Sequence, residues 1–208
     1  MKRAFGMPRP RYDPVNRYDA ILRAGEILLC EGYDSAQPQL IAKMAGVSVG
    51  LFYRHFKNKQ RLLTTIMAHH LNALHAQIAQ DIQQCTYPID ALQCVLVSTL
   101  RYFRTHQGLI KLFFMEIGYG DAEATQHLKG ARQTYRNLLM SVLLDGIAKE
   151  VFLDQKTLDV QIAVNSIVGT INWSLYDLLV VHNEDIEPEE LAQRLLSYFL
   201  RSLARPGS

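Results

Sequence analysis

The chain has 208 residues, enough for one large domain or for a small domain joined to one of ordinary size. Its hydrophobic share of 49% is typical of a globular protein with a buried core, and its net charge is +2. No apolar run approaches the roughly 18 to 20 residues of a membrane span, and the basic N-terminus lacks the apolar stretch of a secretory signal. We therefore expect a soluble, cytoplasmic protein.

Charge and cysteine content narrow the function further. Residues 1–63 hold 11 Lys and Arg against 5 Asp and Glu, so the remainder of the chain is net acidic. The basic end is a candidate phosphate-binding surface, and an arm within residues 1–13 either enters a DNA minor groove or is a disordered tail. The three cysteines are too few for a disulfide framework, and reduced thiols are favoured over a redox sensor. The basic residues of the arm are Lys2, Arg3, Arg9 and Arg11.

Apolar residues at steps of three and four predict helices along the whole chain. Pro38 suits the first position of the second helix, Ser48 can cap the third and Asn58 the fourth. Asp121 and Asp154 are the expected caps of the seventh and eighth helices. No segment shows the alternation of a strand, so we predict an all-α fold of about nine helices. The expected ranges are 14–31, 38–45, 49–55, 58–82, 88–105, 108–117, 121–149, 155–182 and 188–203.

The second and third helices have the pattern of a helix-turn-helix. Gly46 permits the left-handed backbone of the turn, and Phe52 and Phe56 are expected to face the core. Arg54 can bind guanine through two hydrogen bonds, whereas the lysines that follow suit phosphates. The N-terminus of the second helix also offers N–H groups to a phosphate. The candidate DNA-binding residues are Gln37, Pro38, Ser48, Val49, Gly50, Leu51, Tyr53, Arg54, His55, Lys57 and Lys59.

Residues 17–63 resemble the DNA-binding domain of the TetR/AcrR family of transcriptional regulators. The matching residues are Arg17, Ile21, Leu22, Ala24, Gly32, Tyr33, Ile41, Ala42, Ala45 to Ser48, Gly50, Phe52 to Phe56, Lys59, Leu62 and Leu63. The chain departs from the family pattern at Ala36-Gln37-Pro38, at Leu51 and at Gln60. The resemblance implies a DNA-binding domain in residues 14–63, followed by a helical regulatory domain in residues 64–205.

The resemblance also implies a homodimer on double-stranded operator DNA, paired through helices at about 156–181 and 187–203. Small residues suited to close packing at this interface are Ala163, Ser166, Gly169 and Thr170, although core packing within one subunit also explains them. A ligand cavity is expected among the fourth to eighth helices, and its apolar candidates suggest a small hydrophobic effector, although ordinary core packing also explains them. The candidate lining residues are Met67, His70, Leu71, Leu74, Leu96, Leu100, Phe103, Phe113, Phe114, Tyr135, Leu138, Leu139, Asn165, Trp173 and Tyr176.

An enzyme is the remote alternative. The sequence contains no GxSxG, no phosphate-binding glycine loop and no HExxH, and His69, His70 and His75 lack the spacing of a helical metal pair. We therefore predict a DNA-binding transcriptional regulator without cofactor, metal or membrane partner. The favoured mode is a repressor that a hydrophobic effector releases from its operator, and control by a protein partner is the alternative.

Overall fold

The computed structural model describes residues 14–115, 122–154 and 159–205. The N-terminal basic arm and Asp121 lie outside the described residues. Helices account for nearly all of the described chain, and an isolated bridge between Phe152 and Ala204 is its one β-type pairing there. The expected all-α fold is confirmed. The chain divides into two compact units, residues 1–62 and residues 63–208.

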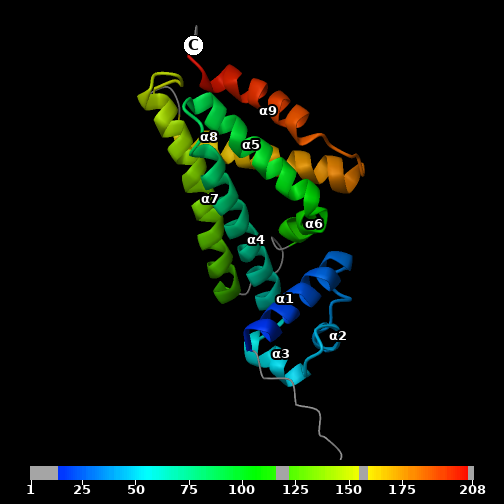
Figure 1. The fold of residues 1–208 in the computed structure, drawn as a ribbon. Helices are drawn as coiled ribbons and strands as arrows, with labels where there is room; N and C mark the ends of the chain where they lie inside the picture. Colours follow the sequence, from blue (N-terminus) through cyan, green and yellow to red (C-terminus); the bar gives the residue numbers. More distant parts are fainter. Residues whose placement is uncertain (1–13, 116–121, 155–158, 206–208) are drawn as a thin grey trace, which may run out of the picture. The chain divides into compact units, whose positions relative to one another are not determined.

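The N-terminal unit contains α1 (Pro14–Glu31), α2 (Pro38–Met44), α3 (Val49–His55) and the first residues of α4 (Lys59–Ile82) (Figure 1). α2 contacts both α1 and α3. Apolar side chains from all these helices form the core: Ile21, Ala24, Leu29, Ile41, Ala42, Phe52, Phe56 and Leu62 are buried. This core fixes the orientation of α3, whose opposite face is left to solvent.

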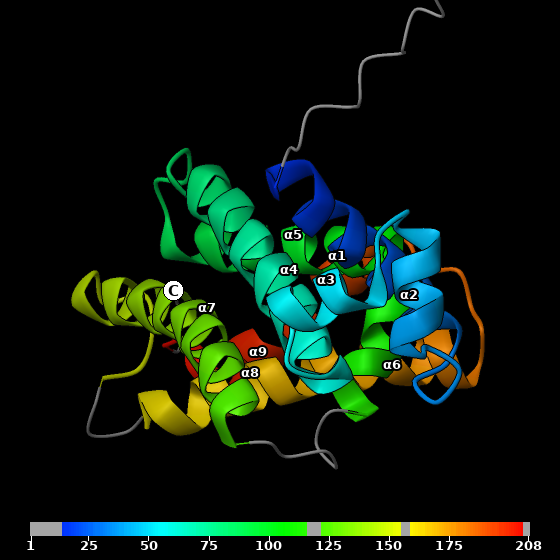
Figure 2. The ribbon, with the colours of Figure 1, turned by 90° about the horizontal axis from the view of Figure 1, so that it is seen from below.

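The larger unit is organised around α5 (Pro88–Thr105), which contacts α6 (Gln107–Met115), α7 (Ala122–Ala148), α8 (Val160–Leu175) and α9 (Pro188–Leu203). α9 lies along α5 in Figure 1, and α7 meets α8 in Figure 2. One face of α5 is buried throughout its length, through Leu92, Val95, Leu96, Thr99, Leu100 and Phe103. A central helix buried in this way places its polar groups next to several other helices at once.

The eighth helix differs from its predicted range and cap. α8 begins at Val160, and the Asp159 carboxylate accepts a hydrogen bond from the Ile162 amide at 3.0 Å, so Asp159 rather than Asp154 is the cap. An aspartate three residues before that amide has the geometry of an N-cap. The predicted helix also changes its winding at Tyr176–Val181, which forms the π-helical segment η2. Residues 155–158 lie outside the described residues.

The end of α7 is joined to the end of α9. The Val151 and Phe152 amides both donate to the Gly146 carbonyl, at 2.9 and 3.1 Å. The Phe152 ring is fully buried and lies against Gly146, where a side chain would overlap it. The Leu153 amide then donates to the Leu203 carbonyl at 2.8 Å. This close approach requires a glycine in the last turns of α7.

Candidate functional site

The turn between α2 and α3 has the backbone that a helix-turn-helix needs. Gly46 has φ of +65°, in the left-handed region that favours glycine, and the Val47 amide donates to the Ala42 carbonyl at 2.9 Å. Gln37 precedes α2 without capping it through its side chain, and instead donates its side-chain amide to the Asp34 carbonyl at 2.8 Å. The Gln37 side chain is therefore engaged in its own loop.

α3 separates an inner face from an outer face. The Ser48 hydroxyl accepts a hydrogen bond from the Leu51 amide at 3.2 Å and so fixes the start of the helix. Phe52 is completely buried, whereas Tyr53 is 48% exposed and Arg54 is also exposed. The outer face of α3 therefore presents an aromatic ring and a guanidinium group to solvent.

The remaining DNA-binding candidates have mixed environments. Ser48, Gly50 and Lys57 are exposed, and Val49 and Leu51 are half-buried. His55 is half-buried, with its ring edge-on to Tyr18 at a centroid distance of 5.6 Å, so part of its surface packs within the unit.

Lys59 has a clear role within the N-terminal unit. Its ammonium group donates to the Tyr33 carbonyl and lies 3.9 Å from the centroid of the Tyr33 ring. Burial lowers the pKa of Lys59, and the charge of Asp34 opposes that shift. Lys59 therefore joins the start of α4 to the loop after α1, in addition to its predicted contact with a phosphate.

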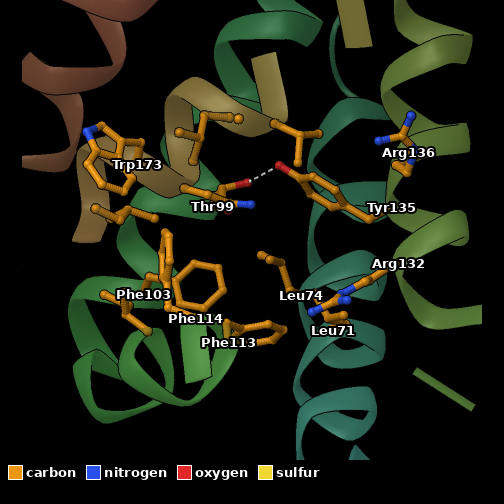
Figure 3. Close-up of a pocket in the computed structure, with 16 residues that line it drawn as sticks. Leu71, Leu74, Thr99, Phe103, Phe113, Phe114, Arg132, Tyr135, Arg136 and Trp173 are labelled. Atoms are coloured by element: carbon orange, nitrogen blue, oxygen red, sulfur yellow. Dashed lines mark hydrogen bonds between the residues drawn. The ribbon is translucent and has the colours of Figure 1, made fainter. Parts of the chain in front are cut away.

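Side chains of helices α4 to α8 in the larger unit line a partly open cavity of about 400 Å³ (Figure 3). Its walls are mainly apolar, and the rings of Phe103, Phe113 and Phe114 gather on one side of it. The full lining comprises Leu71, Leu74, Thr99, Phe103, Ile110, Phe113, Phe114, Arg132, Tyr135, Arg136, Val168, Gly169, Ile171, Asn172, Trp173 and Leu175. A concave, mostly apolar space with few polar groups is typical of a small-molecule site.

A hydroxyl pair forms a polar point in this wall. The Tyr135 hydroxyl lies 2.9 Å from the Thr99 hydroxyl, which also donates to the Val95 carbonyl at 2.7 Å. Since a threonine hydroxyl has one hydrogen, Tyr135 is the donor to Thr99. Burial raises the pKa of Tyr135 to about 12, so its hydroxyl is neutral at physiological pH.

Two arginines supply the positive charge of the cavity. Arg132 and Arg136 are four residues apart on α7, on the same face as Tyr135, and both are half-buried (Figure 3). Arg136 donates to the side-chain oxygen of Asn165. The residues that line the described cavity include no Asp or Glu. The arrangement is therefore an apolar chamber with two cationic side chains in its wall, which suits an amphiphilic anion.

The structure brings about half of the predicted ligand residues to this cavity. Leu71, Leu74, Phe103, Phe113, Phe114, Tyr135 and Trp173 line it. Met67, Leu96, Leu100, Leu138 and Leu139 are buried but lie outside the lining.

The three polar candidates chosen with them also lie outside the lining. Asn165 is exposed and holds Arg136, and the ring centroids of Tyr176 and Phe114 are 4.3 Å apart. The Nδ1 atom of His70 lies 2.6 Å from the hydroxyl oxygen of Tyr102.

Among the polar lining residues, sequence reasoning missed Thr99, Asn172 and the two arginines. It also missed the lining residues Ile110, Val168, Gly169, Ile171 and Leu175. The helical spacing of Arg132 and Arg136 around Tyr135 is a signal that could have suggested them, because residues three and four apart share a helix face. Thr99 carried no such signal, since its role depends on α5 and α7 packing together.

A helix-turn-helix with an exposed outer face, followed by a helical unit with a cavity, defines the class of helix-turn-helix transcriptional regulators. Residues 21–66 match the family model of bacterial regulatory proteins of the tetR family. Residues 85–176 match that of the tetracyclin repressor-like C-terminal domain. The chain belongs to the TetR family of transcriptional regulators. Its expected classification as a DNA-binding regulator rather than an enzyme is thereby confirmed.

Several relatives share both units. The fatty acid metabolism regulator protein of Bacillus subtilis (strain 168) is 27% identical over 188 residues, which are 86% of this chain and 93% of that protein. The crystal structure of the transcriptional regulator FadR from Bacillus subtilis in complex with stearoyl-CoA has a TM-score of 0.79 at 24% identity, covering 89% and 98% of the two chains. The fatty acid degradation regulator FadR from Bacillus halodurans has a TM-score of 0.77 at 24% identity, covering 88% and 97%.

Proposed function

We propose that this regulator is a transcriptional repressor that acts in the bacterial cytoplasm, and that its effector is a long-chain fatty acyl thioester of coenzyme A. The observation that carries the proposal is the combination of an apolar cavity with Arg132 and Arg136 at its wall. The likeness to a fatty acid metabolism regulator, and to a fold that binds stearoyl-CoA in another protein, supports the same class of ligand.

The two parts of such a ligand match the two parts of the cavity. An alkyl chain gains about 0.8 kcal/mol for each buried CH₂ group, and the aromatic and aliphatic walls provide that environment. Phosphate oxygens form short, charge-assisted hydrogen bonds with arginine, frequently through two nitrogens at once.

The first test varies the length of the acyl chain. We expect palmitoyl- or stearoyl-CoA to release the protein from operator DNA, with affinity rising about fourfold for each added CH₂ until the cavity is full. Fluorescence anisotropy of labelled operator DNA measures release, and isothermal titration measures binding. Free coenzyme A and acetyl-CoA are the matched controls. Release that does not depend on chain length would contradict the proposal.

The link between cavity and DNA lies in α4. This helix continues from the helix-turn-helix unit into the cavity-bearing unit, where Leu71 and Leu74 line the cavity. An effector shifts the equilibrium between DNA-binding and released states only by its difference in affinity for them. We propose that displacement of α4 at Leu71 and Leu74 provides this difference.

The exposed apolar face of α8 supports the proposed homodimer through the last two helices. Ile162 and Trp173 on α8 are each 62% exposed, and Tyr198 on α9 is 61% exposed. Contrary to the expectation from the sequence, the helical stretch Val160–Val181 is long and apolar enough to cross a membrane, and most of it is not buried within the single chain. One such helix is a weak indication of a membrane span. A second copy of the chain would cover the same face, which agrees with dimeric DNA binding in the family.

A charge on this face tests the dimer. Ile162→Asp places an acidic group at the exposed N-terminal end of the stripe formed by Ile162, Ser166, Gly169 and Trp173. We expect it to produce monomers and to weaken operator binding at least tenfold. Sedimentation velocity measures the oligomeric state. Gln161→Asp changes the neighbouring exposed position and should leave the dimer intact. A dimeric Ile162→Asp variant would contradict this interface.

The outer face of α3 predicts different effects for two exposed cations. Arg54→Ala should cost about 1–3 kcal/mol of operator binding and relax the preference at one base pair, as expected for a guanine contact. Lys57→Ala should weaken all sequences alike and lower the salt dependence of binding. Anisotropy titrations against a set of single-base operator variants separate the two. Identical profiles for both variants would show that Arg54 does not contact a base.

A further inference from the structure

The larger unit has a second hollow, which shares no lining residue with the proposed effector cavity. It is a polar groove of about 700 Å³ between the C-terminal part of α4 and the outer face of α5. Cys85 and Cys94 both line this groove, and their sulfur atoms are 3.2 Å apart. Cys85 lies in the short connection after α4, and Cys94 lies on α5, so the pair joins the two helices across their loop.

We propose that Cys85 and Cys94 form a reversible disulfide when the protein meets a hydroperoxide. A disulfide bond is about 2.05 Å long, so the two sulfur atoms need to approach by only about 1 Å. Cys85 can make this movement because its connection is outside regular helix, between Ile82 and Pro88. The open groove gives a small oxidant access to both sulfurs.

The surroundings favour a disulfide over a metal site. The carboxylate of Asp81, which lines the same groove, accepts hydrogen bonds at both oxygens, from Gln77 at 2.9 Å and from Ser98 at 2.7 Å. Among the described residues, no group of three His, Cys, Asp or Glu side chains is placed to hold a metal ion. The surroundings therefore favour reaction of the Cys85 and Cys94 sulfurs with each other over binding of a metal ion.

The chemistry balances with one hydroperoxide molecule. The Cys85 sulfur attacks one oxygen of the peroxide, and the O–O bond breaks. With hydrogen peroxide as the oxidant, the products are the Cys85 sulfenic acid and one water molecule. The Cys85 sulfenic acid is then attacked by the Cys94 sulfur, the S–O bond breaks, and a second water carries away the remaining hydrogen. Two thiols are oxidised and the peroxide is reduced. Burial, together with the Cys85 contact, raises the pKa of Cys94 to about 11, so Cys94 is a poor nucleophile for the first attack on the peroxide.

A reversible bond at this position would fasten the end of α4 to α5. Both helices also provide walls of the effector cavity, through Leu71 and Leu74 on α4 and Thr99 and Phe103 on α5. Disulfides in cytosolic proteins are mostly transient and serve catalysis or redox sensing. The site is thus a point at which oxidation restrains the helix pair, independently of which effector fills the cavity.

Thiol mapping of the full chain tests the proposal. Trypsin releases residues 62–101 as one peptide that contains Cys85 and Cys94, whereas Cys30 lies in the peptide 24–43. After treatment with hydrogen peroxide, we expect uptake of N-ethylmaleimide by peptide 62–101 to fall from two groups to none. Dithiothreitol should restore both groups, and the Cys30 peptide should still take up one.

Variants separate the pair from general oxidation. Cys30→Ser should behave as the wild type. Cys85→Ser should keep its one remaining label after peroxide, because Cys94 does not take the first step. Cys94→Ser should stop at the Cys85 sulfenic acid, which dimedone labels, and its peptide should contain no disulfide. Three results on the wild type would overturn the proposal. They are retention of two labels, a loss that dithiothreitol does not restore, and a disulfide that joins either cysteine to Cys30 or to another chain.

Discussion

Reversing the charge of both cavity arginines is expected to abolish the response to acyl-CoA. In the variant Arg132→Glu/Arg136→Glu, two groups that would bind ligand phosphates become groups that repel them. Hydrogen bonds to charged groups contribute about 1.5–3 kcal/mol each, so the loss of two corresponds to a fall in affinity of at least 100-fold. Isothermal titration with palmitoyl-CoA measures this fall, and operator affinity without ligand should change less than twofold.

Two control variants make the result specific. Lys129 is on the same helix, is exposed and does not line the cavity. Lys129→Glu therefore alters the charge of α7 without changing a residue of the proposed anion site. Asn165→Ala removes the side-chain partner of Arg136 but keeps both guanidinium groups, and should weaken binding by less than tenfold. If the double variant were released by the same palmitoyl-CoA concentration as the wild type, the arginines would not hold the anionic part of the ligand.

The N-terminal unit was predictable in detail because its signals are local. Gly46 supplies the positive φ that the turn requires, and Ser48 accepts the hydrogen bond of an amide at the start of α3. Phe52 follows from the spacing of apolar residues on the core face. Each of these requirements involves residues within a few positions of one another. The exception is Lys59, whose contact with Tyr33 spans 26 residues and was not foreseen.

The cavity was predictable only as a region of the chain. Met67, Leu71 and Leu74 follow one apolar stripe of α4, yet the last two line the cavity and Met67 is fully buried away from it. Periodicity distinguishes the inner face of a helix from its outer face, but the choice between packed core and open cavity depends on the opposite helices. The π-helical winding of Tyr176–Val181 was also not predictable from periodicity, because the sequence there remains apolar and helical in pattern.

The second large effect is expected at Gly146, where α7 meets the turn that follows it. A Cβ placed on Gly146 would lie within 3.0 Å of three ring carbons of Phe152, closer than real Cβ atoms come to their neighbours. The ring is fully buried, and backbone hydrogen bonds to the end of α9 hold the chain on both sides of Phe152, so moving the ring would require its surroundings to shift. Gly146→Ala should therefore lower the free energy of unfolding by about 3 kcal/mol, at the upper end of the usual cost of overpacking.

A matched glycine on the same helix gives the opposite expectation. A Cβ at Gly130 meets nothing within 4 Å, so Gly130→Ala should raise the free energy of unfolding by up to about 1 kcal/mol through helix propensity alone. Urea unfolding followed by the fluorescence of Trp173, the chain's one tryptophan, compares the two within the larger unit. Adding Phe152→Leu to Gly146→Ala removes part of the ring and should restore a share of the lost stability, which a double-mutant cycle measures. If both glycine variants changed stability in the same direction, the close packing of Phe152 on Gly146 would be wrong, because helix propensity acts on both positions alike.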